Sequence, residues 1–135
     1  MPTVTEVRNG LADAINAGMD LRTSPLVLDS MVPPIAVVAR APFDPRYVFT
    51  QSKAAYPFYV RLYAGRADER SAQEKLDAWT DLTGDDSVIA AIQDSANWTA
   101  VDVDYAVVTN ISEVQTAAIG ESVYLTVELS VEVVF

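Results

Sequence analysis

The feature that most constrains the fold is the regular alternation of apolar and polar residues from Ser122 to Phe135. Every odd position from Val123 onward is apolar, and the even positions are mostly polar. Because successive side chains of a β-strand point to opposite faces, this pattern predicts one strand with an apolar face and a polar face. At about 3.3 Å per residue the strand would be roughly 45 Å long. It would reach past the core of so small a domain, so something else, such as another chain, should cover the overhang.

The composition excludes most catalytic chemistry. The chain of 135 residues contains no Cys and no His. It therefore lacks disulfides, thiolate nucleophiles, the usual zinc ligand and the commonest general base near neutral pH. Asp102 and Asp104 could form half of a divalent cation site, but two carboxylates are too few for a dedicated one. We expect no enzyme activity, no cofactor and no bound metal.

The charge balance narrows the partners. Nine basic residues stand against nineteen acidic ones, a net charge of −10. Such a surface disfavours binding to nucleic acid phosphates and to anionic membranes. Charged side chains also interrupt the first 21 residues, which argues against a signal peptide or a membrane span. Since half of the residues are hydrophobic, we expect a single domain over residues 1–135, made in a cytoplasm and without a membrane partner.

Periodicity predicts an α+β fold in the order α-β-β-α-α-β-β, with a four-stranded, mainly antiparallel sheet and helices on one face. The first helix begins after Thr3, a plausible N-cap with Glu6 three residues later, and ends near Gly18. The other predicted elements are strands over 35–39, 56–64, 101–107 and 122–135, a helix over 68–82 and a short helix from Val88. The residues expected to face the helices include Val103, Tyr105, Val127, Leu129 and Val131.

Residues 41–55 are predicted to form an extended arm. Pro42 and Pro45 disfavour regular structure at its start, and basic and aromatic side chains follow. Tyr, Phe and Arg are enriched in protein interfaces, although some of these side chains could simply pack on the body of the domain. The candidate interface residues are Arg46, Tyr47, Phe49 and Tyr56.

The polar parity of the last two predicted strands forms a candidate acidic face, relieved chiefly by Arg61. Its members are Asp102, Asp104, Glu128 and Glu132. An ordinary solvated sheet face would carry the same residues as a surface that is acidic for a functional reason, and the pattern alone leaves both interpretations open.

In their order and spacing, several segments resemble the tail terminator (tail completion) proteins of long-tailed, siphovirus-type bacteriophages. The resemblance covers nearly the whole chain and begins with the N-terminal amphipathic helix. The other segments that carry it are Val32–Val38, a variable arm, Phe58–Arg66, Asp68–Asp77, Thr83–Ile92 and the alternating C-terminal strand. No single segment is diagnostic, and the sequence carries no catalytic fingerprint.

The resemblance implies a homo-oligomeric ring, usually a hexamer, that caps the tail tube and ends tail elongation. Such a ring joins the tail to the head–tail connector (stopper) protein, so its partners are itself, the tail tube protein and the connector. It would act at the tail–neck junction of the virion after assembly in the host cytoplasm. DNA would pass through an acidic channel without specific binding. The alternatives are a tail-tube or other neck ring protein and, more distantly, a carboxylate-dependent small enzyme or ligand-binding α+β domain.

Overall fold

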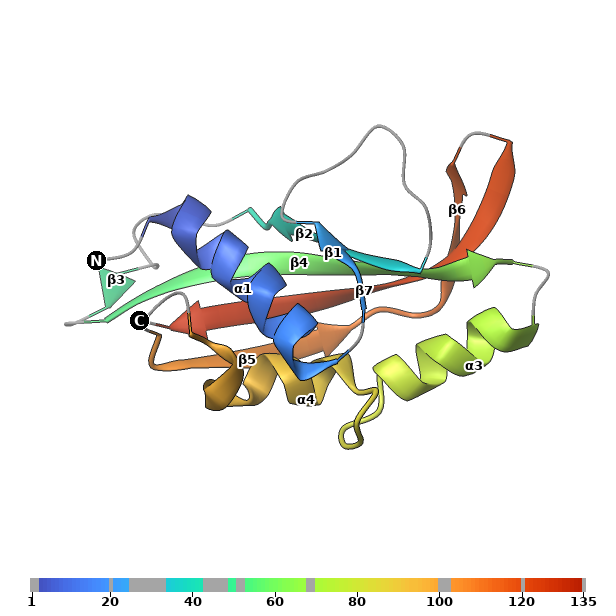
Figure 1. Cartoon of the computed structure of the whole chain (residues 1–135). Coiled ribbons are helices and arrows are strands. Elements are labelled where there is room, and N and C mark those ends of the chain that lie inside the picture. The colour runs from blue at the N-terminus through green and yellow to red at the C-terminus, as the bar shows by residue number, and fades with distance from the viewer. Residues whose placement is uncertain are drawn as a thin grey trace.

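The computed structural model describes residues 3–19, 21–24, 34–42, 49–50, 53–67, 70–99, 103–119 and 121–134. In this part of the chain, helices pack against a long twisted sheet (Figure 1). The helices are α1 (Val4–Gly18), α3 (Arg70–Trp79), α4 (Val88–Gln93) and the 3₁₀ turn η1 (Ser95–Asn97). The strands are β1 (Thr23–Ser24), β2 (Ile35–Arg40), β3 (Phe49–Thr50), β4 (Lys53–Arg66), β5 (Tyr105–Ile111), β6 (Gln115–Ile119) and β7 (Ser122–Val134).

The sheet has the order β1-β2-β4-β7-β5, with β3 paired to β4 and β6 paired to β7. The β1–β2 pair is parallel and the other pairs are antiparallel. The α+β prediction is therefore confirmed. The predicted four-stranded sheet lacked β1, β3 and β6. The two-residue strands β1 and β3 are too short to show a period, and the sequence of β6, Gln-Thr-Ala-Ala-Ile, does not alternate.

The two long strands, β4 and β7, form the centre of the sheet. They pair from Ala55 opposite Val134 to Arg66 opposite Tyr124, with one irregularity between Tyr63 and Gly65. The register places the even residues of β4 and the odd residues of β7 on the same face. This face bears Phe58, Leu62 and Leu129, all fully buried.

The three α-helices of the described segments contribute their apolar stripes to the core on that face. The buried helix residues of the cluster include Val7, Leu11 and Ile15 from α1, Ala72, Leu76 and Trp79 from α3, and Val88, Ile89 and Ile92 from α4. These are the stripes that the helical spacing predicts. The prediction that helices cover one face of the sheet is confirmed.

Side-chain caps fix where two of these helices begin. The Thr3 hydroxyl accepts a hydrogen bond from the Glu6 backbone N–H at 3.1 Å, as predicted for the start of α1. The Ser87 hydroxyl accepts one from the Ala90 N–H at 3.0 Å and caps α4. Between α3 and α4 the chain turns at Gly84, whose φ of 115° is a conformation that favours glycine.

A proline lies inside the central strand β4, where the missing N–H would normally cost a ladder hydrogen bond. The Pro57 carbonyl accepts a hydrogen bond from the Ala41 N–H at 3.1 Å, so both backbone groups of Pro57 point toward the β2 side. Strand β2 ends at Arg40, and the ladder stops at this point. The proline therefore removes a donor where the neighbouring strand has already ended.

The prediction for the strand before the β6–β7 hairpin was wrong in position and parity. Strand β5 begins at Tyr105 rather than at residue 101, and Ala106 is buried where Tyr105 was expected. Asp104 lies in a bend immediately before the strand, which breaks the alternation read through Val103 and Tyr105. Val103 still packs against the core, but from this preceding segment. Tyr105 is 53% exposed and does not face the helices.

The assigned core face predicts a large difference between two substitutions in β7. Leu129→Ala removes a fully buried side chain and should lower the free energy of unfolding by about 2–5 kcal/mol through lost burial and a residual cavity. Thr126→Ala, at a partly exposed position on the opposite face, should cost much less. Chemical denaturation of both variants measures the difference. A larger loss of unfolding free energy for Thr126→Ala would mean that the core face of the sheet is wrongly assigned.

Candidate assembly surfaces

The sheet face opposite the helices carries an ion pair at its centre. Arg61 of β4 lies directly across from Glu128 of β7, and the Arg61 Nε donates to a Glu128 carboxylate oxygen at 2.9 Å. Both side chains are partly exposed, so water and salt screen the attraction and its contribution to stability is of the order of 1 kcal/mol or less. The pair neutralises one of the carboxylates assigned to the acidic face.

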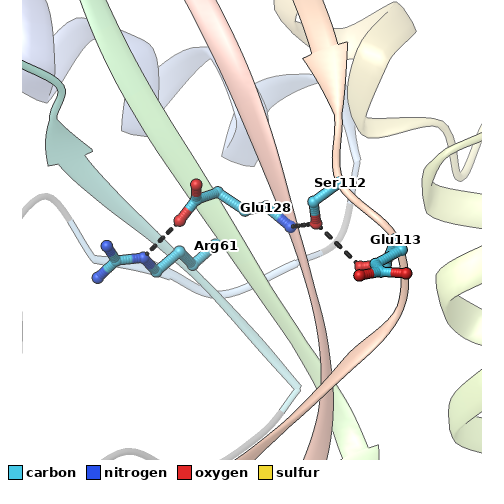
Figure 2. A network of polar contacts seen from close by, with 4 residues as sticks. All are labelled: Arg61, Ser112, Glu113 and Glu128. Carbon is cyan, nitrogen blue, oxygen red and sulfur yellow. Dashed lines mark hydrogen bonds and ion pairs between the residues drawn. The ribbon is translucent and has the colours of Figure 1, made fainter.

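Ser112 hydrogen-bonds to β7 at Glu128, and we call the contacts of this residue the serine clip (Figure 2). The Ser112 hydroxyl accepts a hydrogen bond from the Glu128 N–H at 2.8 Å and donates one to the Glu113 backbone carbonyl at 3.0 Å. The Ser112 N–H also donates to the Glu128 carbonyl at 2.9 Å. Residues 112–114 separate β5 from β6, so the clip lies where the partner of β7 changes.

Beyond this clip, the hairpin of β6 and the start of β7 bends away from the rest of the sheet (Figure 1). Burial along β7 changes at the same place. Val127, Leu129, Val131 and Val133 are buried, whereas Val123 is 48% exposed despite its apolar parity. Val114, just before β6, is 47% exposed. The predicted overhang of this strand is confirmed, and its cover by another chain stays a prediction.

A small polar pocket of about 210 Å³ lies between the bent hairpin and the sheet. It is lined by Arg61, Tyr63, Thr126 and Glu128 from the sheet and by residues 115–117 of β6. The guanidinium and carboxylate in this pocket bind each other. The two charged side chains of this pocket are therefore paired with each other.

A second concave surface lies at the edge of the sheet formed by β5. A groove of about 330 Å³ runs between this strand, α4 and the turn after α3. Its lining includes Leu82, Ile89, Gln93 and residues 108–111. The Gln93 side-chain carbonyl accepts a hydrogen bond from the Val108 N–H at 3.2 Å, which covers one outward donor of the edge strand. Leu82 is 72% exposed.

Sequence reasoning missed this groove. Leu82 was included in a predicted helix over 68–82, but α3 ends at Trp79 and Leu82 follows in an Asp- and Thr-containing turn. An apolar side chain in a polar turn was the available signal. Only the folded structure shows that Leu82 lines the same groove as Ile111.

The structure brings together half of the predicted acidic face. Glu128 and Glu132 lie on β7 with the parity that points away from the helices, and Glu132 is exposed. Asp104 lies outside β5, in the bend before it, where its N–H donates to the Val134 carbonyl at 2.7 Å. Asp102 is outside the described residues. The alternation that assigned Asp104 to the same face fails because the strand starts after it.

The predicted arm contains regular structure. Phe49 belongs to β3, where it pairs with Ala54 of β4, so a short hairpin closes the end of the arm. Arg46 and Tyr47 lie outside the described residues. Tyr56 was wrongly assigned to an interface: its parity in β4 points to the helices, and it is only 9% exposed within the core.

Among the described residues, no group of three or more acidic side chains is placed to hold a metal ion. Within the same segments, no helix is long and apolar enough to cross a membrane. No protein-family model matches this chain, and no curated protein matches it in sequence. Structural support for a function therefore comes from the hairpin, the groove and the sheet face opposite the helices.

The two tyrosines whose positions differ from the prediction give a direct test of the observed parity. Tyr56→Ala should lower the free energy of unfolding by about 3–5 kcal/mol, the range for removing a buried aromatic side chain. Tyr105→Ala, at an exposed edge position, should change it by less than about 1 kcal/mol. Thermal and urea unfolding of both proteins measure this. Equal losses would contradict the assignment of β5.

Proposed function

We propose that this chain is the subunit of a ring, most simply a hexamer, that caps a bacteriophage tail tube and ends its elongation. The same ring joins the tail to the head–tail connector protein. The resemblance to tail terminator proteins supplies the biological role, and the surfaces described above supply its physical basis. In this role the protein has no enzymatic activity and works through contacts with copies of itself and with the tube.

The observation that carries this proposal is the overhanging hairpin of β6 and β7. Val123 is exposed at the start of β7, past the part of the strand that packs on the core, and Val114 is exposed just before β6. Exposed apolar residues on a projecting element are a typical protein contact surface. A closed ring requires two different complementary patches on every subunit, and a projecting element of this kind supplies one of them.

The face opposite the helices is the proposed wall of the DNA channel. Its exposed carboxylate is Glu132, whereas Glu128 is paired with Arg61. Negative charge along a channel lowers the affinity for phosphates, which favours passage over retention. To repel DNA, this face needs only an excess of negative charge. The net charge of −10 per subunit is consistent with a channel that repels phosphates.

Electron microscopy of the purified protein tests the proposed assembly against its main alternative. A tail terminator forms short closed rings and stops growth, whereas a tail-tube protein stacks into long tubes. Adding the protein to polymerising tail tube protein should give capped tubes that no longer elongate. Long tubes of the chain alone would favour the tail-tube alternative, and absence of any effect on tube length would contradict the capping function.

The hairpin contact predicts a loss of assembly without a loss of folding. Val114→Ser combined with Val123→Ser removes two exposed apolar side chains, so the thermal midpoint should change little. Ring formation or tube capping should fall sharply because an apolar contact is lost. The matched control is Thr116→Ser with Ala118→Ser, at exposed positions of the same hairpin. Full capping activity of the Val114→Ser/Val123→Ser variant would exclude the hairpin as the contact.

The channel assignment predicts that Glu132→Arg rings retain DNA. Reversing this carboxylate leaves the Arg61–Glu128 pair intact, so it changes the charge of the face with little disturbance. Rings carrying Glu132→Arg should bind DNA at low salt and release it as salt rises. The control is Glu121→Arg, an exposed change of equal charge in the turn before β7. Equal DNA binding by both rings would place this face outside the channel.

A further inference from the structure

The charges of this chain are divided sharply along the sequence. All nine Lys and Arg residues lie in the first 75 positions, the last of them being Lys75. Eleven of the nineteen Asp and Glu residues lie after it. The final 60 residues therefore carry a net charge of −11, and the first 75 residues carry +1.

The fold converts this division into two opposite edges of one sheet. The edge formed by β1 and β2 lies at one side and the edge formed by β5 at the other. In the described segments 21–24 and 34–42, the charged residues are Arg22 and Arg40, and both are exposed. In the described segments 80–99 and 103–114 every charged residue is acidic. These residues are Asp81, Asp85, Asp86, Asp94, Asp104 and Glu113.

The strand register places one charge from each edge at the same level of the sheet. Thr23 of β1 pairs with Ala36, which leads through Leu62 to Val127 of β7. On the other side of β7, Glu128 pairs with Ser112 and Thr126 with Gln115. Val127 is therefore level with Glu113 and Val114. Arg22, next to Thr23, lies level with Glu113 across the width of the sheet.

Arg40 is level with the apolar groove. It pairs with Phe58, which leads through Val131 to Val108 of β5. Val108 lines the groove together with Leu82. The turn that carries Leu82 also carries the exposed carboxylates of Asp81, Asp85 and Asp86.

We propose that the acidic β5 edge of one copy binds the Arg22–Arg40 edge of the next copy, with Arg22 opposite Glu113. An axis of rotation running along the strands keeps neighbouring subunits at the same height, so the levels within one sheet become the levels across the contact. A symmetric β5–β5 contact would instead bring acidic edges together, and like charges in contact cost several kcal/mol. Charge complementarity therefore favours the head-to-tail arrangement.

This contact rests on the proposed ring and adds a pair of complementary edges to the hairpin contact, and it can be tested without phage components. Self-association of the purified chain is measured by sedimentation velocity. Arg22→Glu alone and Glu113→Arg alone should each weaken it on the order of tenfold or more, because each creates a like-charge pair. The serine clip uses only the backbone carbonyl of Glu113, so Glu113→Arg leaves that hydrogen bond in place.

Two restorations separate this contact from a general effect of net charge. The double variant Arg22→Glu/Glu113→Arg exchanges the charges and should associate as the unaltered chain does. Mixing the two single variants should also restore association, because one has two basic positions and the other two acidic ones. Salt is a poor substitute for these variants, since it screens both the attraction at the edges and the net repulsion between copies.

The matched control is Lys75→Glu, an exposed change of equal charge away from the two edges and from the β6–β7 hairpin. It should leave association unchanged. Leu82→Ser provides an independent variant that keeps the charges and removes the exposed groove residue, and it should also weaken association.

Failure of both restorations, or an unaltered chain that remains monomeric at the highest attainable concentration, would overturn the head-to-tail contact. Tube capping distinguishes this result from failure of the proposed function. If the chain still caps tubes while the charge variants behave like the control, the ring function stands and the edge contact is wrong.

Discussion

The pairing of β4 with β7 is the interaction on which the rest of the structure depends. These two strands present one continuous apolar face to α1, α3 and α4, and each further strand in the described part of the chain pairs with one of them or with β2. The same pairing sets the opposite face, because a strand that points Leu129 into the core must point Glu128 away from it. The core and the candidate channel face are therefore two consequences of a single register.

The helices, their caps and the parity of both long strands could be predicted from the sequence because each depends on a local period. Thr3 and Ser87 act within one turn of helix, and Val127, Leu129 and Val131 alternate without interruption. The edge strands could not be predicted in the same way. The start of β5 depends on the bend at Asp104, and Tyr56 reads equally well as an interface residue until its pairing with Val133 places it in the core. The groove beside Leu82 depends on contacts between distant segments, which no local pattern reports.

The assembly proposals share one physical theme, which is the unequal distribution of polar and apolar groups over a small sheet. Projecting apolar residues at the β6–β7 hairpin favour a partner, and acidic groups on the face opposite the helices disfavour phosphate. The β1–β2 edge carries exposed basic residues and the β5 edge carries acidic ones, so the two edges favour binding partners of opposite charge. A subunit with unlike edges cannot satisfy both of them in a symmetric pair, and this asymmetry favours a head-to-tail contact, which gives the proposed ring only where the rotation between copies closes.

The proline in β4 has a consequence for the folding process. Strand β4 must find a partner more than 60 residues away, since Arg61 and Glu128 are separated by 67 positions. Pairing at such distance is slow because loop closure precedes any gain from contacts. During that interval a long strand rich in aromatic residues is open to pairing with other chains. Pro57 removes one N–H from the β2 side of this strand while leaving the β7 side complete. It therefore disfavours further strand pairing on the β2 side, past the end of β2, and does not obstruct the native partner β7.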